Sequence, residues 1–128
     1  MKIDFLDLAR QELDDAFDWY EAQAPGLGYD FLSEIDRAVR RILVYSQSAA
    51  IIETGLRRVL INRFPYGIIY GLDEDRVVGV AVAHLHREPC YWIDRIVYST
   101  KPDGRNMVRE RRTMYGRKRQ RRSNKAIV

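Results

Sequence analysis

The sequence is short of the residues that mark secreted, metal-binding and membrane-spanning proteins. It has a single cysteine, Cys90, among 128 residues, so no internal disulfide can form. Acidic residues interrupt every apolar stretch near Met1, so we expect no secretory signal. No stretch approaches the roughly 20 apolar residues of a membrane-spanning helix. These absences lead us to expect a cytoplasmic protein that does not contact a membrane.

Charge is distributed unevenly along the chain. Residues 101–128 contain 11 Lys and Arg against 2 Asp and Glu, a net charge of +9, whereas residues 1–100 carry −5. Apolar residues make up 46 % of the chain, enough to bury one core, but the chain is too short for two ordinary domains. We therefore expect one domain over residues 1–97 and a basic extension over residues 98–128, with different partners for each.

Apolar residues in the first third recur at the three- and four-residue spacing of two helices. The first run covers residues 6–24 and the second covers residues 31–43, with Pro25-Gly26-Leu27-Gly28 as a break between them. A loop this short joins antiparallel helices. One face of the first helix is acidic, and we interpret it as a solvated face made of Glu12, Asp14, Asp15, Asp18 and Glu21.

Three later segments have the β-branched and aromatic composition of strands, and they cover residues 56–64, 66–72 and 76–84. Short breaks separate them, which favours antiparallel hairpins. The most apolar run, residues 77–83, should lie inside the sheet. With a short strand over residues 2–5, the predicted fold is α+β in the order β-α-α-β-β-β. An N-terminal strand and a helical hairpin pack on a curved antiparallel sheet.

In this order, several local sequences resemble the ParE branch of the ParE/RelE toxin superfamily over about residues 1–95. They are Pro25–Leu32, like the loop between the helices, Leu56–Leu60 and Arg63–Tyr70, like the first two hairpin strands, and Val80–Arg95, like the last strand and tail. The resemblance implies a plasmid-stabilisation toxin of a bacterial type II toxin–antitoxin system, silenced by a cognate antitoxin. ParE-type members are associated with DNA gyrase, and RelE-type members cut messenger RNA on the ribosome. No cofactor is implied.

The candidate catalytic residues for the RNA-cutting alternative are Arg63, His84, Arg87 and Tyr91. The resemblance places Arg87 at a cutting-branch arginine and Tyr91 near the proton-transfer tyrosine, whereas Arg63 would have to reach in from a different strand. Such a reaction needs cations beside the cleaved phosphate and a group that moves a proton. In the cutting branch an arginine usually follows the tyrosine at the start of the second hairpin strand, and here Gly67 follows Tyr66. We interpret this replacement as evidence against ribonuclease activity.

His84 and His86 would project from one face if their strand continued. They could act as a base, or bind a metal with Cys90 and Asp94. A structural zinc site normally shows four ligands at recognisable spacing, and no such pattern is present, so we expect no metal. The ordinary alternative is a histidine that ends a strand and hydrogen-bonds a neighbouring backbone.

Four residues are candidates for binding the antitoxin or the target: Arg57, Arg58, Trp92 and Arg95. Trp92 lies beyond the last predicted strand and is the better surface candidate among the aromatics, whereas Tyr70 should be core. The alternatives are that Trp92 packs in the core and that Arg57, Arg58 and Arg63 protect strand edges from aggregation.

From Lys101 onward the apolar pattern is lost, and we expect the extension over residues 98–128 to be disordered or partly helical, with a helix starting near Arg109. Its basic run resembles arginine-rich nucleic-acid-binding segments and consists of Arg117, Lys118, Arg119, Arg121 and Arg122. The alternative is an extension with only non-specific affinity. Three functions therefore remain: a toxin that binds a protein target, a ribosome-dependent ribonuclease, and an inactive homologue with a nucleic-acid-binding tail.

Overall fold

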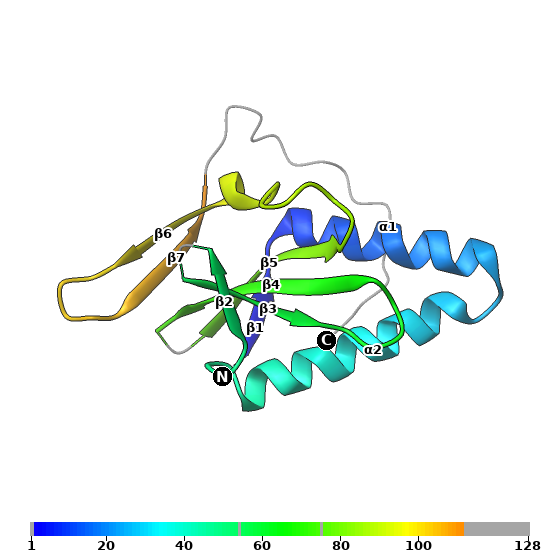
Figure 1. Ribbon diagram of the computed structural model, residues 1–128, viewed down its shortest axis with the longest axis horizontal. Helices are drawn as coiled ribbons and strands as arrows, with labels where there is room; N and C mark the ends of the chain where they lie inside the picture. The colour runs from blue at the N-terminus through cyan, green and yellow to red at the C-terminus, as the bar shows by residue number, and fades with distance from the viewer. Residues whose placement is uncertain (1, 54, 75, 112–128) are drawn as a thin grey trace.

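Two sheets and two long helices make up the computed structural model (Figure 1), which describes residues 2–53, 55–74 and 76–111. In chain order the elements are β1 (Ile3–Phe5), α1 (Asp7–Gln23), α2 (Leu27–Val44), β2 (Ala50–Glu53), β3 (Leu56–Leu60), β4 (Tyr66–Asp73), β5 (Arg76–His84), the 3₁₀ turn η1 (Ile93–Arg95), β6 (Ile96–Thr100) and β7 (Asn106–Glu110). In the described part of the chain, neither helix combines the length and apolar character needed to cross a membrane.

The larger sheet has the strand order β1-β5-β4-β3-β2. β1 pairs with β5 in parallel, and the other neighbours are antiparallel, so the sheet is mixed. β5 has a neighbour on each side, as its apolar sequence predicts. The α+β fold and the order of its first helices and strands are confirmed. The short strand β2 extends the sheet beyond the predicted hairpins.

The helical hairpin forms because α1 buries residues at helical spacing and because the connection is tight. The buried apolar residues of α1 are Ala9, Leu13, Ala16 and Phe17. Gly26 adopts a φ of 88°, a left-handed conformation that favours glycine. A Cβ on Gly28 would lie 2.8 Å from the Phe17 carbonyl oxygen, so the absent side chain lets the two helices approach closely.

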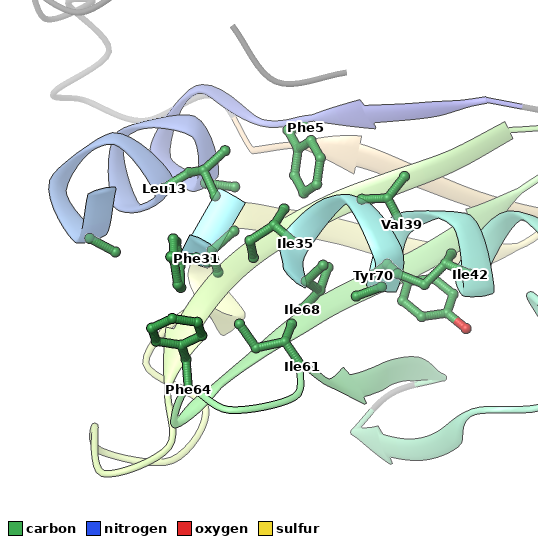
Figure 2. Close-up of a cluster of buried hydrophobic side chains, with 14 of the residues drawn as sticks. Phe5, Leu13, Phe31, Ile35, Val39, Ile42, Ile61, Phe64, Ile68 and Tyr70 are labelled. Carbon is green, nitrogen blue, oxygen red and sulfur yellow. The ribbon is translucent and has the colours of Figure 1, made fainter. Parts of the chain in front are cut away.

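One face of the sheet packs against both helices and forms the first core (Figure 2). Phe31, Ile35 and Ile42 of α2 meet Ile68 and Tyr70 of β4, and all five are fully buried. The Tyr70 hydroxyl donates a hydrogen bond of 2.7 Å to the Ser46 carbonyl oxygen, so its polar end is paired. The prediction that Tyr70 is a core residue is confirmed.

The opposite face of the sheet is covered by residues of the segment 90–111 and forms a second core. Trp92, Ile96 and Val108 pack there against strand residues that include Ile69 and Val80. β6 and β7 form an antiparallel hairpin, which in Figure 1 points away from the turn between α1 and α2. The expected helix near Arg109 is therefore wrong. These residues form a strand, and the alternation of side chains in β7 places Val108 against the larger sheet, where it is fully buried.

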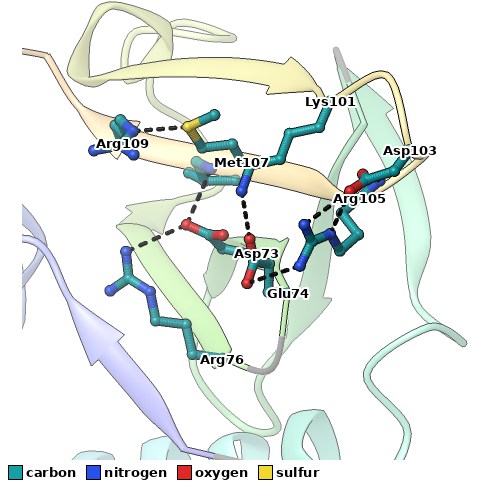
Figure 3. Close-up of polar contacts among 9 residues, drawn as sticks. Asp73, Glu74, Arg76, Lys101, Asp103, Arg105, Met107 and Arg109 are labelled. Atoms are coloured by element: carbon teal, nitrogen blue, oxygen red, sulfur yellow. Dashed lines mark hydrogen bonds and ion pairs between the residues drawn. The ribbon is translucent and has the colours of Figure 1, made fainter.

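Polar contacts tie the β6–β7 hairpin to the turn between β4 and β5 (Figure 3). The Val108 backbone N–H donates to Asp73 Oδ2 at 3.2 Å, and Lys101 Nζ donates to Glu74 Oε2 at 2.7 Å. The hydrogen bond from Lys101, together with the positive charges of Lys101 and Arg105, lowers the pKa of Glu74 from its ordinary value of 4.5. The turn and the hairpin are thus linked by charge as well as by apolar packing.

This lowered pKa predicts how the hairpin contact responds to acid. The carboxylate is favoured in the folded state, so its stabilising effect is fully present above pH 4.5 and is lost as the pH falls through the lower folded-state pKa. An NMR titration of the Glu74 carboxyl carbon should show a midpoint below 4.5, with the Lys101 signals moving over the same range. In Glu74→Gln the Lys101 change should vanish. A midpoint at or above the ordinary value would contradict the contact.

Candidate functional site

Aromatic rings gather where β5 ends, and they come from α1, β4 and β5. The Tyr66 ring lies 5.0 Å from His84 and 6.2 Å from Tyr20, measured between centroids. Burial raises the pKa of Tyr66, and the charges of Glu12 and Asp15 add to this, whereas Arg87 opposes it. The hydroxyl of Tyr66 therefore lies among charged groups at the edge of the first core.

The two histidines stay close although the strand does not continue between them. β5 ends at His84, and His86 lies in the following turn. The two rings are 5.1 Å apart, and the His86 backbone N–H donates to His84 Nδ1 at 3.0 Å. One imidazole nitrogen of His84 therefore accepts a local backbone hydrogen bond, which is the ordinary role considered for a histidine at a strand end.

Arg87 and Tyr91 form a stacked pair next to this cluster. The guanidinium carbon of Arg87 lies 3.7 Å from the Tyr91 ring centroid, and Arg87 is exposed. The Tyr91 hydroxyl donates a hydrogen bond of 2.5 Å to Glu12 Oε2. Burial, and then this hydrogen bond and the charge of Glu12, hold the pKa of Tyr91 far above its usual value of 10.0. The Tyr91 hydroxyl therefore stays protonated, and its hydrogen bond is intramolecular.

Glu12 is the centre of a largely buried polar network that sequence reasoning missed. Its carboxylate accepts two hydrogen bonds of 2.9 Å from the guanidinium of Arg95, a bidentate ion pair. The side chains of Glu12 and Arg95 are only 15 % and 14 % exposed. The interpretation of Glu12 and Asp14 as parts of a solvated face is wrong, since Asp14 is only 6 % exposed. One signal was present, because Glu12 is one helical turn from the buried residues Ala9 and Ala16.

The position of this ion pair follows from the end of β1. The parallel pairing with β5 stops at Gly79, whose carbonyl oxygen accepts the Leu6 N–H, and the chain then turns into α1. The edge of β5 beyond this point would leave backbone groups unpaired. Arg95 donates to the Val80 carbonyl oxygen at 3.1 Å, and the Val82 N–H donates to Glu12 at 2.9 Å. The ion pair thus takes the place of a neighbouring strand.

Arg63 and Gly67, the other positions raised by the RNA-cutting alternative, make different contacts. Arg63 lies in the loop between β3 and β4, pairs with Asp30 of α2 at 3.6 Å and lies over the Phe64 ring. Its contacts are thus with α2 and Phe64, whereas Arg87, Tyr91 and Arg95 interact with one another through the Tyr91 ring. A Cβ on Gly67 would lie 3.2 Å from Arg58 Cγ, so the aliphatic part of Arg58 fills the space beside this glycine.

The candidate binding residues fall into two groups. Trp92 is 4 % exposed within the second core and Arg95 is held in the buried ion pair, so the expectation that Trp92 lies on the surface is wrong. Arg57 donates to the carbonyl oxygens of Gln47 and Ala49 at 3.0 and 2.8 Å. β3 has a strand on each side, so edge protection does not explain Arg57 or Arg58.

The expected tail residues Arg117, Lys118, Arg119, Arg121 and Arg122 lie outside the described residues.

Comparisons with known proteins agree with this architecture. A solved chain described as "Chromosomal ParDE TA system from P. aeruginosa" superimposes with a TM-score of 0.59 at 18 % sequence identity. The match covers 67 % of this chain and 97 % of that chain, and at this identity it shows a shared fold. Among curated protein sequences, no match was found.

The helical hairpin on a mixed sheet is thus a fold that this chain shares with that solved chain. Residues 3–89 match the family model of the "ParE toxin of type II toxin-antitoxin system, parDE". This match spans more than half of the chain, so the chain belongs to the ParE toxin family. The match ends before Cys90, and the segment that covers the second face of the sheet lies beyond it.

Proposed function

We propose that this type II toxin is neutralised by a cognate antitoxin in the cytoplasm and acts by binding a cellular protein such as DNA gyrase. The observation that carries the proposal is that two side chains that RNA cleavage would need, Tyr91 and Arg63, are engaged in contacts within the protein. The Tyr91 hydroxyl donates a hydrogen bond to the Glu12 carboxylate, and Arg63 pairs with Asp30 on α2. Family membership supports the toxin role, and these contacts favour binding over catalysis.

RNA cleavage remains the second candidate, and its demands are specific. Stabilising the charge on a cleaved phosphate requires preorganised donors, and loss of one such donor costs on the order of 3 kcal/mol. Gly67 supplies no side chain where the cutting branch usually has arginine. The Tyr91 hydroxyl, with its strongly raised pKa, is a poor proton donor or acceptor near neutral pH. Arg87 is the cation that either mechanism would use.

The surface proposed for the target is the exposed turn that follows β5. Leu85 is 41 % exposed, and His86 and Arg87 beside it are exposed. The stacking of Arg87 on Tyr91 preorganises its guanidinium, which lowers the conformational entropy lost when a partner binds. Arginines and aromatic rings are enriched among residues that dominate protein interfaces. These features support a protein partner at this end of the sheet.

Expression of the chain with and without the antitoxin encoded beside it tests the proposal. Without antitoxin, we expect growth to stop while transcripts remain intact and chromosomal DNA becomes relaxed or damaged. Co-expression of the antitoxin should restore growth. Codon-adjacent cuts in messenger RNA would instead support the ribonuclease, and normal growth would support an inactive homologue that retains only antitoxin or nucleic-acid binding.

Arg87→Ala is the matching test of the surface. It should weaken target binding by about 2 kcal/mol, roughly 30-fold, because an exposed arginine held on an aromatic ring is a typical interface anchor. Growth inhibition should fall accordingly while the thermal unfolding midpoint stays within a few degrees. Arg40→Ala, which removes a 76 % exposed arginine on α2, is the control and should leave toxicity unchanged. Unchanged toxicity in Arg87→Ala would remove this residue from the surface.

A further inference from the structure

The guanidinium of Arg87 is exposed and rests on one aromatic ring. Its central carbon lies 3.7 Å from the Tyr91 ring centroid, whereas the other two arginine–ring contacts in the described segments measure 5.2 and 5.3 Å. None of the ion pairs among the described residues includes Arg87, although Glu88 follows it directly in the chain. The place of this guanidinium therefore depends on where the Tyr91 ring is held.

The Tyr91 ring is in turn held at its hydroxyl by Glu12. The hydroxyl donates to Glu12 Oε2, and Glu12 Oε1 accepts the Val82 backbone N–H at 2.9 Å. Arg95 donates to both carboxylate oxygens at 2.9 Å. The carboxylate is thus tied to β5 and to Arg95 as well as to its own helix, α1. A hydrogen bond to a group held in this way restricts the rotation of the Tyr91 side chain.

Glu12 also offsets a repulsion between two arginines at the same ring. The guanidinium carbon of Arg95 lies 5.2 Å from the Tyr91 ring centroid, on which Arg87 is stacked as well. Two like charges at one ring repel each other. The bidentate pair with Glu12 neutralises the charge of Arg95. The carboxylate therefore acts on Arg87 in two ways, by orienting the ring and by reducing the repulsion from Arg95.

The backbone immediately before Tyr91 has an unusual conformation. Cys90 has a φ of 62°, in the left-handed region that residues other than glycine rarely adopt. Such conformations persist where the surrounding contacts hold the chain. Cys90 and Tyr91 both pack partly against the second core, and the Cys90 carbonyl oxygen accepts the Ile93 N–H at 3.0 Å. The turn that carries the Tyr91 ring is thus fixed by packing as well as by Glu12.

We propose that Glu12 is a positioning residue for the surface that binds the protein target. Acting through the Tyr91 hydroxyl, it holds the Arg87 guanidinium in the orientation in which the target meets it. This inference rests on the proposed function, in which Arg87 contacts the target, and adds a largely buried residue of α1 that forms no ion pair with Arg87. A long side chain that is already ordered loses less conformational entropy when a partner binds.

Tyr91→Phe is the sharpest test, because it keeps the ring under Arg87 and the Glu12–Arg95 pair but removes the hydroxyl that links them. In NMR relaxation of the full chain without target, the order parameter of the Arg87 Nε–H should fall below about 0.6, the range of flexible groups. The amount of protein needed to stop growth should rise about 3- to 10-fold, the cost of ordering one long side chain during binding.

Tyr98→Phe is the matched control, because it removes a hydroxyl from another partly buried tyrosine of the segment 90–111. It should change neither the mobility of Arg87 nor toxicity. Glu12→Gln should raise the mobility of Arg87 as Tyr91→Phe does. Since changes at Glu12 also break the buried ion pair, Tyr91→Phe remains decisive if that variant folds poorly.

A double-mutant cycle separates positioning from a merely structural effect. Adding Tyr91→Phe to Arg87→Ala should reduce toxicity no further than Arg87→Ala alone, because the hydroxyl acts through Arg87. An additional loss of the same size in the double variant would overturn the positioning role. Unchanged mobility of Arg87 in Tyr91→Phe, with toxicity lost in Arg87→Ala, would overturn it while leaving the target surface in place. Increased mobility with full toxicity in Arg87→Ala would instead overturn the target surface.

Discussion

Glu12→Ala is expected to lower the free energy of unfolding by about 3–5 kcal/mol, the usual cost of removing one partner from a buried ion pair. The substitution leaves the Arg95 guanidinium buried without its carboxylate. It also removes the acceptor for the Val82 N–H and for the Tyr91 hydroxyl. An unpaired buried donor costs free energy because it has lost water without gaining a partner.

Urea denaturation followed by circular dichroism would measure this loss. Asp36→Ala is the matched control, because Asp36 pairs with Arg40 at 2.9 Å on the surface of α2 and Arg40 is 76 % exposed. That surface pair should contribute about 0.3–0.5 kcal/mol. Combining Glu12→Leu with Arg95→Met should cost less than the two single changes together. If Glu12→Ala cost no more than Asp36→Ala, the role assigned to the ion pair would be wrong.

Trp92→Ala should lower the free energy of unfolding by about 3–5 kcal/mol, the range for removing a large aromatic side chain from a core. Trp92 is 4 % exposed and packs on the sheet face opposite the helices. Its removal would leave a cavity between the sheet and the extension. Such a loss would mean that the segment 90–111 stabilises the domain, although the family match ends at residue 89.

Val97→Ala provides the comparison for Trp92, because Val97 lies five residues later in β6, on the exposed side of the β6–β7 hairpin, and is 45 % exposed. It should change stability by less than about 1 kcal/mol, since its side chain contributes little to either core. Thermal unfolding of both variants, measured at equal concentration, is sufficient. Equal midpoints for the two variants would show that the extension does not share the cooperative core.

Glu12→Ala and Trp92→Ala both test whether the segment beyond the family match is an integral part of the folded domain. Glu12 belongs to the part of the chain that matches the ParE toxin family, whereas its partners Tyr91 and Arg95 come from beyond that match. The ion pair therefore joins the family domain to its extension. Arg87 lies next to this junction, so the surface proposed for the target and the root of the basic extension are both held in place by it.

Much of the fold could be predicted from the sequence because its signals are local. The apolar spacing over residues 6–24 and 31–43 predicts two helices, and Pro25 with Gly26 marks the turn that the structure shows. The apolar run of residues 77–83 predicts an interior strand, and it corresponds to β5. The quoted motifs were sufficient to identify the toxin superfamily, since they occur in the family's order and spacing.

The β6–β7 hairpin, the burial of Trp92 and the role of Glu12 were decided only by tertiary structure. β6 and β7 are five residues each and bury few side chains, so their local pattern is close to that of a solvated segment. Whether Trp92 is core depends on the apolar sheet face that residues far away in the chain present to it. Glu12 and Arg95 are 83 residues apart. The ion pair forms because β1 ends at Phe5, opposite Gly79, and leaves two backbone groups of β5 beyond that point without a strand partner. The spacing of apolar residues indicates which side of a helix or strand is apolar, but contacts between segments distant in the chain decide which charged side chains become buried.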